Sequence, residues 1–355
     1  MRMTRARRDR IREQLPVLGA DAMLVTKLVN VRYLTGFSGS AGIVLVGAED
    51  VFFTDSRYDE QSAREAADCR RVIPPKDGDK VLAAEIVGAG VSKLAIEASH
   101  VTLSTARQWR ENMPSVELVE TSGVVEELRK VKDATEVEAL RRASAIGDEG
   151  LRALLPRLRE GMTEVEAAAE LEDAMRRAGS EGLSFPTIIA FGEQAAEPHH
   201  SPTERRLRRG DLIKLDFGAI TDGYHSDMTR TIAFGDPAPE LEKIYEIVRS
   251  AQQAGVEAVA SGKSGEEVDA AARSIVEAAG HTFGHGTGHG CGLEVHEAPG
   301  IRRGSDDVLA PGMAVTVEPG IYVPGLGGVR IEDLVVVTDD ACDVLTRSPK
   351  ELVRV

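Results

Sequence analysis

Two stretches of the chain repeat one pattern: glycine, five residues, a carboxylate, one residue and a second glycine. They are residues 210–218 and 312–320, so the second copy lies 102 residues after the first. Another carboxylate follows each copy, and the four carboxylates are Asp216, Asp227, Glu318 and Glu332. Carboxylates gathered on apolar strands repel one another and lose hydration, and a bound cation compensates both effects. The repeated pattern therefore predicts a metal site.

The spacing of the first pair indicates a hairpin. Residues 221–222 lie midway between Asp216 and Asp227, and the neighbouring Gly223 suits a hairpin turn. We therefore predict that the two aspartates lie directly opposite each other on one face, with Cβ atoms roughly 5 Å apart.

The second pair repeats this logic with a longer turn. Glu318 and Glu332 flank a glycine-rich loop at 324–328, and Arg330 shares a strand face with Glu332. A single pair of this kind would be interpreted as a surface feature. Two copies at one offset, both in apolar strands, favour a set of metal ligands instead.

Histidines gather between the two copies, where His285, His289 and His296 fall within twelve residues. Segment 285–290 has glycine at every second position, and each glycine disfavours a helix by about 1 kcal/mol relative to alanine. In an extended segment, residues i and i+4 still share a face, so one of His285 and His289 can bind metal while the other meets a substrate. A phosphate-binding glycine loop is the alternative, but the segment lacks the Gly-Lys-Ser/Thr ending of such loops.

Three further histidines, His199, His200 and His225, lie near the carboxylate strands, and His199 is the counterpart of His296 in the repeat. Oxygen-rich ligands with one imidazole suit Mn²⁺, with Zn²⁺, Co²⁺ and Fe²⁺ as alternatives. Two such ions at roughly 3.5–4 Å generate a hydroxide at neutral pH and polarise a carbonyl group. The predicted chemistry is two-metal hydrolysis.

The elements that would carry these residues also repeat. Helices are predicted from about 134 and at 163–178 in the first copy, and from about 238 and at 264–279 in the second. Three capping boxes begin helices, at Asp133/Glu136, Thr163/Glu166 and Ser264/Glu267. Two such units related by a pseudo-twofold axis would bring both hairpins to one centre. We predict one duplicated α+β domain over residues 134–355.

Residues 1–125 alternate short strands with helices, which predicts a separate α/β domain joined by a linker at 126–133. The expected strands are 22–26, 42–46, 51–54 and 93–97, and the expected helices are 58–67 and 104–112. A glycine fingerprint for a dinucleotide is missing from this region. The basic run at 1–12 predicts the solvated face of a first helix.

Composition narrows the classes of protein. A net charge of −15 argues against nucleic acid as the main partner, and the sequence contains no apolar stretch long enough to span a membrane. The three cysteines, Cys69, Cys291 and Cys342, are far apart and outside Cys-x-x-Cys pairs, which argues against a disulfide framework or a zinc knuckle. We expect a cytoplasmic protein.

The motifs together resemble the pita-bread metallopeptidase family, which includes methionine aminopeptidase, aminopeptidase P, prolidase and creatinase-like proteins. The matching phrases are 215–218, 224–230, 285–290, 295–297, 317–320 and 328–333. Segment 30–37 resembles the N-terminal domain of the proline-specific branch. The resemblance implies a ribonuclease H-like α/β domain of the creatinase N-terminal type, followed by an α+β pita-bread catalytic domain.

The resemblance also implies roles for particular residues. The five implied metal ligands are Asp216, Asp227, His289, Glu318 and Glu332. Asp216 would chelate one metal, His289 and Glu318 would hold the other, and Asp227 and Glu332 would bridge. Glu318 would also shuttle the proton of the attacking water.

Four other side chains would surround the substrate. His199 and His296 would bind it, His285 would support the pocket, and Arg330 would lock Glu332 or meet the substrate. Lys214, two residues before Asp216, is either a structural counter-ion or the exposed start of its strand.

The implied reaction is hydrolysis of the Xaa-|-Pro bond at the N-terminus of proline-containing peptides by a homodimeric aminopeptidase. The alternative is a dipeptidase (prolidase) limited to Xaa-Pro dipeptides. A creatinase-like C–N hydrolase and a metal-free peptide-binding module are less favoured, because this chain keeps all five ligand positions.

Overall fold

The computed structural model describes residues 2–76 and 78–355. The chain divides into two compact units, Met1–Arg129 and Lys130–Val355. Helix α6, Val124–Lys130, occupies most of the predicted linker at 126–133.

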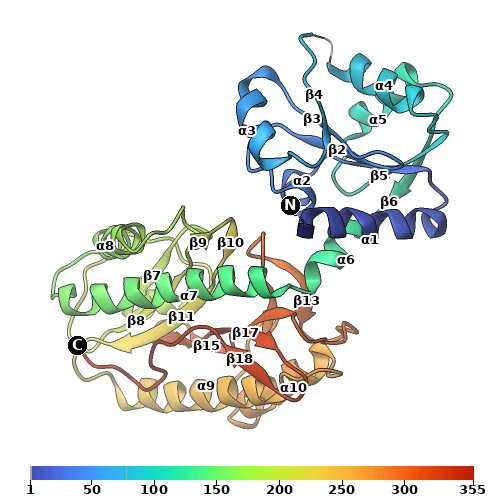
Figure 1. Cartoon of the computed structure of the whole chain (residues 1–355). Coiled ribbons are helices and arrows are strands. Elements are labelled where there is room, and N and C mark those ends of the chain that lie inside the picture. The colour runs from blue at the N-terminus through green and yellow to red at the C-terminus, as the bar shows by residue number, and fades with distance from the viewer. Residues whose placement is uncertain (1, 77) are drawn as a thin grey trace. The chain divides into compact units, whose positions relative to one another are not determined.

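The first unit is built on one mixed six-stranded sheet in the order β4-β3-β2-β1-β5-β6 (Figure 1). Its strands are β1 Ala22–Val25, β2 Ile43–Val46, β3 Val51–Phe53, β4 Arg70–Val72, β5 Lys93–Glu97 and β6 Glu117–Thr121. Its helices are α1 Arg2–Leu18, α2 Leu28–Thr35, α3 Asp59–Glu65, α4 Gly78–Gly88, α5 Leu103–Asn112 and α6. Helix α2 was not predicted because its β-branched and aromatic residues disfavour a helix, yet most of them are buried against the unit.

The basic run at the start of the chain lies only partly on the predicted solvated face, where Arg5 and Arg10 are exposed. It lies in α1, but Arg8 is completely buried. Its guanidinium contacts the carboxylates of Asp50 at 2.8 Å and Asp68 at 2.9 Å. Arg7 lies over the ring of Tyr33, 4.1 Å from its centroid. The sequence pattern could not reveal these partners, because they follow tens of residues later.

The second unit consists of helix pairs and twisted antiparallel strands. Its helices are α7 Ala134–Leu154, α8 Glu164–Arg177, α9 Pro239–Ala258 and α10 Gly265–Ala278. Strands of the first half are β7 Ile188–Phe191, β8 Leu212–Phe217, β9 Ile220–Thr221, β10 Tyr224–His225 and β11 Met228–Ala233. Strands of the second half are β12 Gly288–Gly290, β13 Glu297–Ile301, β14 Ala314–Val317, β15 Gly320–Val323, β16 Gly327–Arg330, β17 Asp333–Val337 and β18 Cys342–Val344.

Helices α7 and α8 pack against strands of the first half, and α9 and α10 pack against strands of the second half (Figure 1). One half contains the sheet β11-β8-β7 and the other contains β13-β12-β14-β17-β18. All three predicted capping boxes are present, at the starts of α7, α8 and α10. The repeat therefore places two equivalent hairpins in this unit, each supported by its own helix pair.

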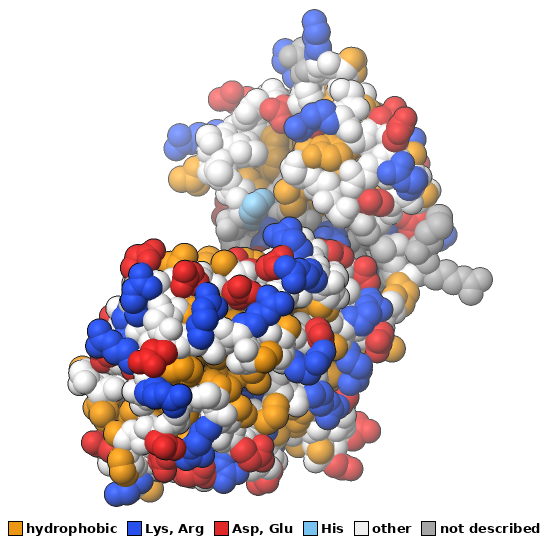
Figure 2. All heavy atoms as spheres, turned by 90° about the vertical axis from the view of Figure 1, so that its left-hand side faces the viewer, with side chains coloured by type: hydrophobic (Ala, Val, Ile, Leu, Met, Phe, Trp, Pro, Cys, Tyr) orange, Lys and Arg blue, Asp and Glu red, His pale blue; other side chains and the backbone are white. Residues whose placement is uncertain are grey.

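On the face of this unit shown in Figure 2, Lys and Arg side chains are interspersed with Asp and Glu. That face carries no extended basic stripe of the kind that follows a phosphate backbone. Within the described ranges, none of the helices is both long and apolar enough to cross a membrane.

Candidate metal centre

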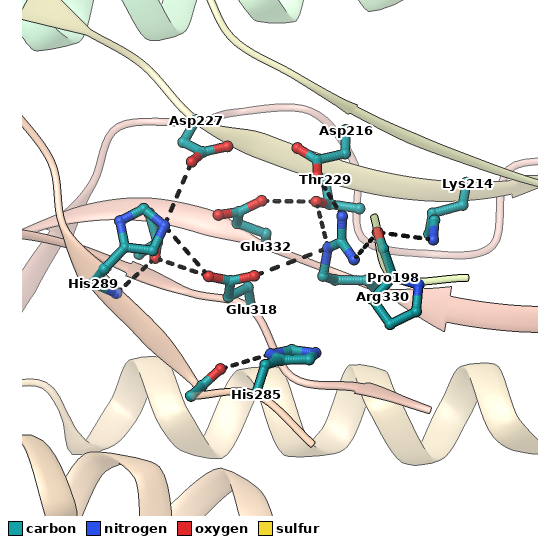
Figure 3. Close-up of polar contacts among 12 residues, drawn as sticks. Pro198, Lys214, Asp216, Asp227, Thr229, His285, His289, Glu318, Arg330 and Glu332 are labelled. Carbon is teal, nitrogen blue, oxygen red and sulfur yellow. Dashed lines mark hydrogen bonds and ion pairs between the residues drawn. The ribbon is translucent and has the colours of Figure 1, made fainter. Parts of the chain in front are cut away.

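One cavity of about 450 Å³ collects every residue that the sequence nominated for the site. Among the residues that line it are the nine nominated ones: His199, Asp216, Asp227, His285, His289, His296, Glu318, Arg330 and Glu332. They come from both halves of the repeat, and Figure 3 shows most of them converging from facing strands. The predicted meeting of the two hairpins is therefore observed.

The first hairpin has a different register from the predicted one. Asp216 pairs with Thr229, and Asp227 lies just before β11. The turn is centred on Asp222 and Gly223, whose φ values are 51° and 77°. Two consecutive residues with positive φ are typical of a type I′ turn, which fixes the register. The prediction of directly opposite aspartates was wrong by two positions, and this even shift leaves both carboxylates on the same face.

The second hairpin keeps the predicted pairing. Val317 pairs with Asp333 before the carboxylates, and Gly320 pairs with Arg330 after them. Continuous register on both sides places Glu318 opposite Glu332. The two glutamates are thus held by ladders that flank them, which limits their freedom before any ligand binds.

His289 lies in β12, between β13 and β14. A Cβ at Gly288 would lie 1.9 Å from the Thr316 carbonyl, and one at Gly290 would lie 2.2 Å from the Ala298 carbonyl. Glycines flank this histidine because neighbouring backbones approach so closely. The prediction that this segment is extended or looping, with close backbone approach and no helix, is confirmed: residues 288–290 form the strand and residues 285–287 are irregular.

The ring of His289 is oriented as a ligand. Nδ1 lies 3.0 Å from the Gly290 carbonyl and donates to it, which leaves Nε2 as the acceptor nitrogen. Nε2 faces Glu318 at 3.4 Å and Asp227 at 3.7 Å. Burial lowers the pKa of His289, which favours the neutral ring that a metal ion requires.

The carboxylates surround a site that lacks sufficient positive charge. Burial, then Glu332 and Asp216, raises the pKa of Asp227 well above its ordinary value. Burial and then Glu318 do the same to the pKa of Glu332. In the described part of the chain, Arg330 supplies the only Lys or Arg nitrogen within 4.0 Å of the four carboxylates.

Two observations test whether a divalent cation suits this donor set. The Oδ1 atom of Asp216 is buried without a hydrogen-bond partner. Oxygen atoms of Asp227 and Glu332 lie with a ring nitrogen of His289 inside a group whose atoms are all within 4.8 Å of one another. Unpartnered carboxylate oxygens around a neutral imidazole fit a divalent ion, whose charge would offset their repulsion.

Arg330 contacts the centre differently from the expectation. Its Nη2 forms an ion pair with Asp216, and its Nε donates to Thr229 Oγ1 at 3.0 Å. Thr229 in turn donates to Glu332 at 2.7 Å, so the arginine reaches Glu332 only through this hydroxyl. Thr229 was missed by the sequence reasoning, although its place two residues after Asp227 indicates that it shares a strand face with that carboxylate.

Tyr322 was also missed and links Arg330 to His285. Arg330 Nη1 donates to the Tyr322 hydroxyl at 2.9 Å, and that oxygen lies 3.0 Å from His285 Nε2. His285 Nδ1 donates to the Gly286 carbonyl at 2.7 Å, so Nε2 accepts from the tyrosine. Tyr322 follows Glu318 by four residues in extended backbone, a spacing that predicts a shared face.

The remaining histidines separate into two groups. His199 and His296 line the cavity, and burial, followed by the charge of His289, lowers the pKa of His296. His200 is buried outside it, with Nε2 2.9 Å from Glu164 and Nδ1 2.7 Å from Glu197. His225 also lies outside the cavity lining and donates its backbone N–H to Gly292.

Lys214 is completely buried, so it is not at the exposed start of its strand. Burial lowers the pKa of its ammonium to about 7, and the charge of Arg330 acts in the same direction. Its nitrogen contacts backbone carbonyls of residues 195–198 and, within the described residues, forms no direct ion pair with a carboxylate.

Comparison with known proteins agrees with this geometry. Residues 138–339 match metallopeptidase family M24, and residues 7–131 match the creatinase/prolidase N-terminal domain. An Xaa-Pro dipeptidase from Pyrococcus furiosus is 37% identical over 336 residues, covering 94% of this chain and 95% of that protein.

Solved structures give the same result. An Xaa-Pro dipeptidase from Bacillus anthracis superposes with a TM-score of 0.97 at 42% identity, covering 99% of this chain and 100% of that one. An X-Pro aminopeptidase from Thermotoga maritima superposes with a TM-score of 0.92 at 34% identity, covering 97% and 100%. These matches confirm the predicted creatinase-type N-terminal domain and the pita-bread catalytic domain, and the family implies divalent metal ions. The chain belongs to metallopeptidase family M24.

Proposed function

We propose that this protein hydrolyses the Xaa-|-Pro bond at the N-terminus of short peptides, using two divalent metal ions. The five proposed ligands are Asp216, Asp227, His289, Glu318 and Glu332. The observation that carries the proposal is their convergence on one cavity, with the imidazole acceptor nitrogen aimed at the carboxylates. Mn²⁺ is the proposed metal, because four of the five donors are carboxylates.

The bound ions would supply a hydroxide at neutral pH and polarise the scissile carbonyl. Glu318 holds and moves the proton: burial raises the pKa of its carboxyl group, so it can take a proton from the attacking water and pass it to the departing proline nitrogen. The neutral ring of His296 and the exposed ring of His199 each present an N–H to the substrate oxygen as its charge grows.

His285 and Arg330 act as positioning residues on this proposal. The ring nitrogens of His285 are engaged by Gly286 and Tyr322. Arg330 donates to Asp216, Thr229, Tyr322 and Pro198, so its donors are already engaged. Together they hold one wall of the cavity and one metal ligand.

Recognition of proline is supported by the apolar part of the cavity wall. A prolyl amide has no N–H, so a site selects it by ring shape and not by accepting a hydrogen bond. Phe185, Pro186 and Ile188 line the same cavity as the proposed ligands and offer that apolar surface.

A limit to dipeptides is the second candidate, and one observation favours it. Arg302 is exposed and lines the cavity. A dipeptide presents its carboxylate immediately after the proline ring, where a cation on the wall can reach it. Both activities occur in the names of the relatives described above.

The test uses metal-stripped protein supplied with Mn²⁺, Zn²⁺, Co²⁺ or Fe²⁺ in separate reactions, with Xaa-Pro and Xaa-Pro-Xaa peptides as substrates. Metal-dependent cleavage of both peptides supports an aminopeptidase. Cleavage of the dipeptide alone selects the dipeptidase, and Arg302→Ala should then raise KM for it. Absence of metal-dependent cleavage of either peptide refutes the proposal.

We also propose a homodimer in the cytoplasm, and light scattering of the purified protein measures the first point. A creatinase-like C–N hydrolase would cleave a non-peptide substrate, and a binding module would retain peptide without cleaving it. The complete donor set speaks against both.

A further inference from the structure

Lys214 is a buried cation to which the proposed reaction gives no role. It lies inside β8, paired with Ala190 of β7 and Thr231 of β11, and is 0% exposed. Its strand neighbours Ile213 and Leu215 belong to the core packed under α7 and α8. Because side chains alternate along a strand, Lys214 points to the opposite face, which it shares with Asp216.

The ammonium of Lys214 is bound by one irregular segment. It donates to the carbonyls of Ala195 at 3.3 Å, Glu197, and Pro198 at 3.3 Å. An ammonium has three N–H donors, and these three carbonyls match them. The ring of Tyr322, with its centroid 5.3 Å from Nζ, covers another side.

The Pro198 carbonyl connects this contact to the metal side. It also accepts from Arg330 Nη1 at 3.2 Å, and Figure 3 shows Pro198 between Lys214 and Arg330. Lys214 and Arg330, from different strands, thus both donate to the backbone carbonyl immediately before His199.

His199 itself makes no side-chain hydrogen bond within the described residues, although it lines the cavity. Its position therefore depends on the backbone on either side. After it, His200 is fixed by Glu164 at 2.9 Å. Before it, Lys214 binds the carbonyls of Ala195, Glu197 and Pro198, and Arg330 shares only that of Pro198. Removing Lys214 therefore loosens the segment on one side of His199 without releasing it completely.

The other half of the repeat shows that the sheet does not require a lysine here. The position equivalent to Lys214 is Thr316, which is also completely buried. Thr316 Oγ1 accepts from the His289 backbone N–H at 3.1 Å and lies 3.5 Å from Glu318, so it serves neighbouring ligands. Lys214 instead contacts the carbonyls of the segment before His199.

We propose that Lys214 is a positioning residue for His199, fixing the Ala195–Pro198 carbonyls so that the imidazole meets the substrate in one orientation. The proposal rests on the proposed peptidase function. Fold stability gives little reason for a charge at this position, because burying an ammonium costs free energy and the equivalent buried position of the second copy is a threonine. A role in placing His199 accounts for it.

The experiment compares wild type with Lys214→Met, and uses Lys263→Met as the matched control. Lys263 is half-exposed and pairs with Glu267 at the start of α10, so the control makes the same chemical change on the surface. Mn²⁺ affinity and melting temperature are measured first. We then measure hydrogen exchange of the peptide covering 195–199 and kcat for an Xaa-Pro peptide. The kcat measurement is repeated in the His199→Ala background.

We expect Lys214→Met to bind Mn²⁺ like wild type, to exchange faster at 195–199, and to lose about 10- to 100-fold in kcat, since misplacement by about 1 Å has effects of that size. In the His199→Ala background the same change should alter kcat by less than about 2-fold, because Lys214 would act on kcat only through the position of the His199 ring. The Lys263→Met control should match wild type in every measurement.

Unchanged exchange at 195–199, unchanged kcat, or losses that multiply in the double variant would each overturn the proposal. If Lys214→Met does not fold, Lys214→Gln, which keeps two N–H donors without the charge, is measured instead, and the same outcomes decide. If neither variant folds, Lys214 is a requirement of the fold and the proposal fails. A wild type that cleaves no Xaa-Pro peptide refutes the proposed function, whereas the exchange measurement still tests the positioning.

Discussion

Replacing Asp227 should stabilise the metal-free protein and destabilise the metal-loaded protein. Its side chain is buried, and its atoms lie within 4.8 Å of those of Glu332 and His289. Two like charges at that distance repel by about 3 kcal/mol at an effective dielectric constant of about 20. Asp227→Asn removes this repulsion without changing the shape of the side chain.

The pH dependence of stability gives a second measure of this carboxylate repulsion. Burial and Glu332 raise the pKa of Asp227 in the folded protein, so folding without metal takes up a proton. The stability of the metal-free protein therefore falls as pH rises above about 4, where the unfolded aspartate ionises. Each pH unit is worth about 1.4 kcal/mol, which bounds the effect at pH 7 at about 4 kcal/mol.

We therefore expect metal-free Asp227→Asn to be about 2–4 kcal/mol more stable than metal-free wild type at pH 7. For a unit of this size, that corresponds to a melting temperature about 5–15 °C higher. With Mn²⁺ at about 1,000 Kd the order should reverse, because wild type then gains about 4.1 kcal/mol, which exceeds that difference, and the variant lacks one proposed ligand.

The assay is calorimetry of both proteins with and without Mn²⁺, with Asp236→Asn as the control. The Asp236 side chain is 98% exposed, so this control removes one charge from the surface and should leave both melting temperatures unchanged. A metal-free Asp227→Asn that melts at or below wild type would show that carboxylate repulsion does not burden the empty site.

Three further predictions follow from the same contacts. Mn²⁺ binding should release protons at pH 7, because the raised pKa values of Asp227 and Glu332 fall when a cation binds. Titration calorimetry in two buffers of different ionisation enthalpy measures this release. Equal apparent binding enthalpies in the two buffers would contradict it. Tyr322→Phe removes the hydroxyl between Arg330 and His285 and should lower kcat about 10-fold with unchanged Mn²⁺ affinity; an unchanged kcat would mean that the link is dispensable. Asp269→Asn should destabilise the fold by about 3 kcal/mol in urea at pH 7, because it leaves the buried Arg273 unpaired. Although burial opposes it, bonding to Arg273 and Thr287 lowers the pKa of Asp269, so this difference should be complete above about pH 4 and disappear as pH falls through that lowered pKa; a difference that persists in acid would contradict the assignment.

Much of the site could be predicted because its information is local. Each carboxylate lies in a short phrase that repeats at one offset, and each capping box spans four residues. Such signals depend on strand alternation and helix caps, which act over a few residues. Once two equivalent hairpins are inferred, their convergence follows from the repeat, without knowledge of any long-range contact.

The errors arose where contacts are distant along the chain or where a turn sets the register. The first hairpin was centred by its carboxylates, whereas the positive φ of Asp222 and Gly223 centres it one residue later. Arg330 was expected to lock Glu332 or meet the substrate; its ion pair is with Asp216, 114 residues away, and it reaches Glu332 through Thr229. Lys214 could not be placed, because its partners belong to an irregular segment that periodicity does not describe.

The duplication accounts for the shape of the centre, and its departures from symmetry account for the chemistry. The two matching hairpins have similar backbones, and each supplies two of the four carboxylates. The proposed imidazole ligand has no such duplicate: His289 lies on β12, a strand whose flanking glycines allow it to enter between two others. The position two residues before the first carboxylate of each copy has diverged in the same way, with Thr316 turned to the ligands and Lys214 turned to the segment before His199. On our proposal, the second half of the repeat completes the metal site and the first half orients the substrate. A change at Thr316 should then affect metal affinity first, and a change at Lys214 should affect turnover first.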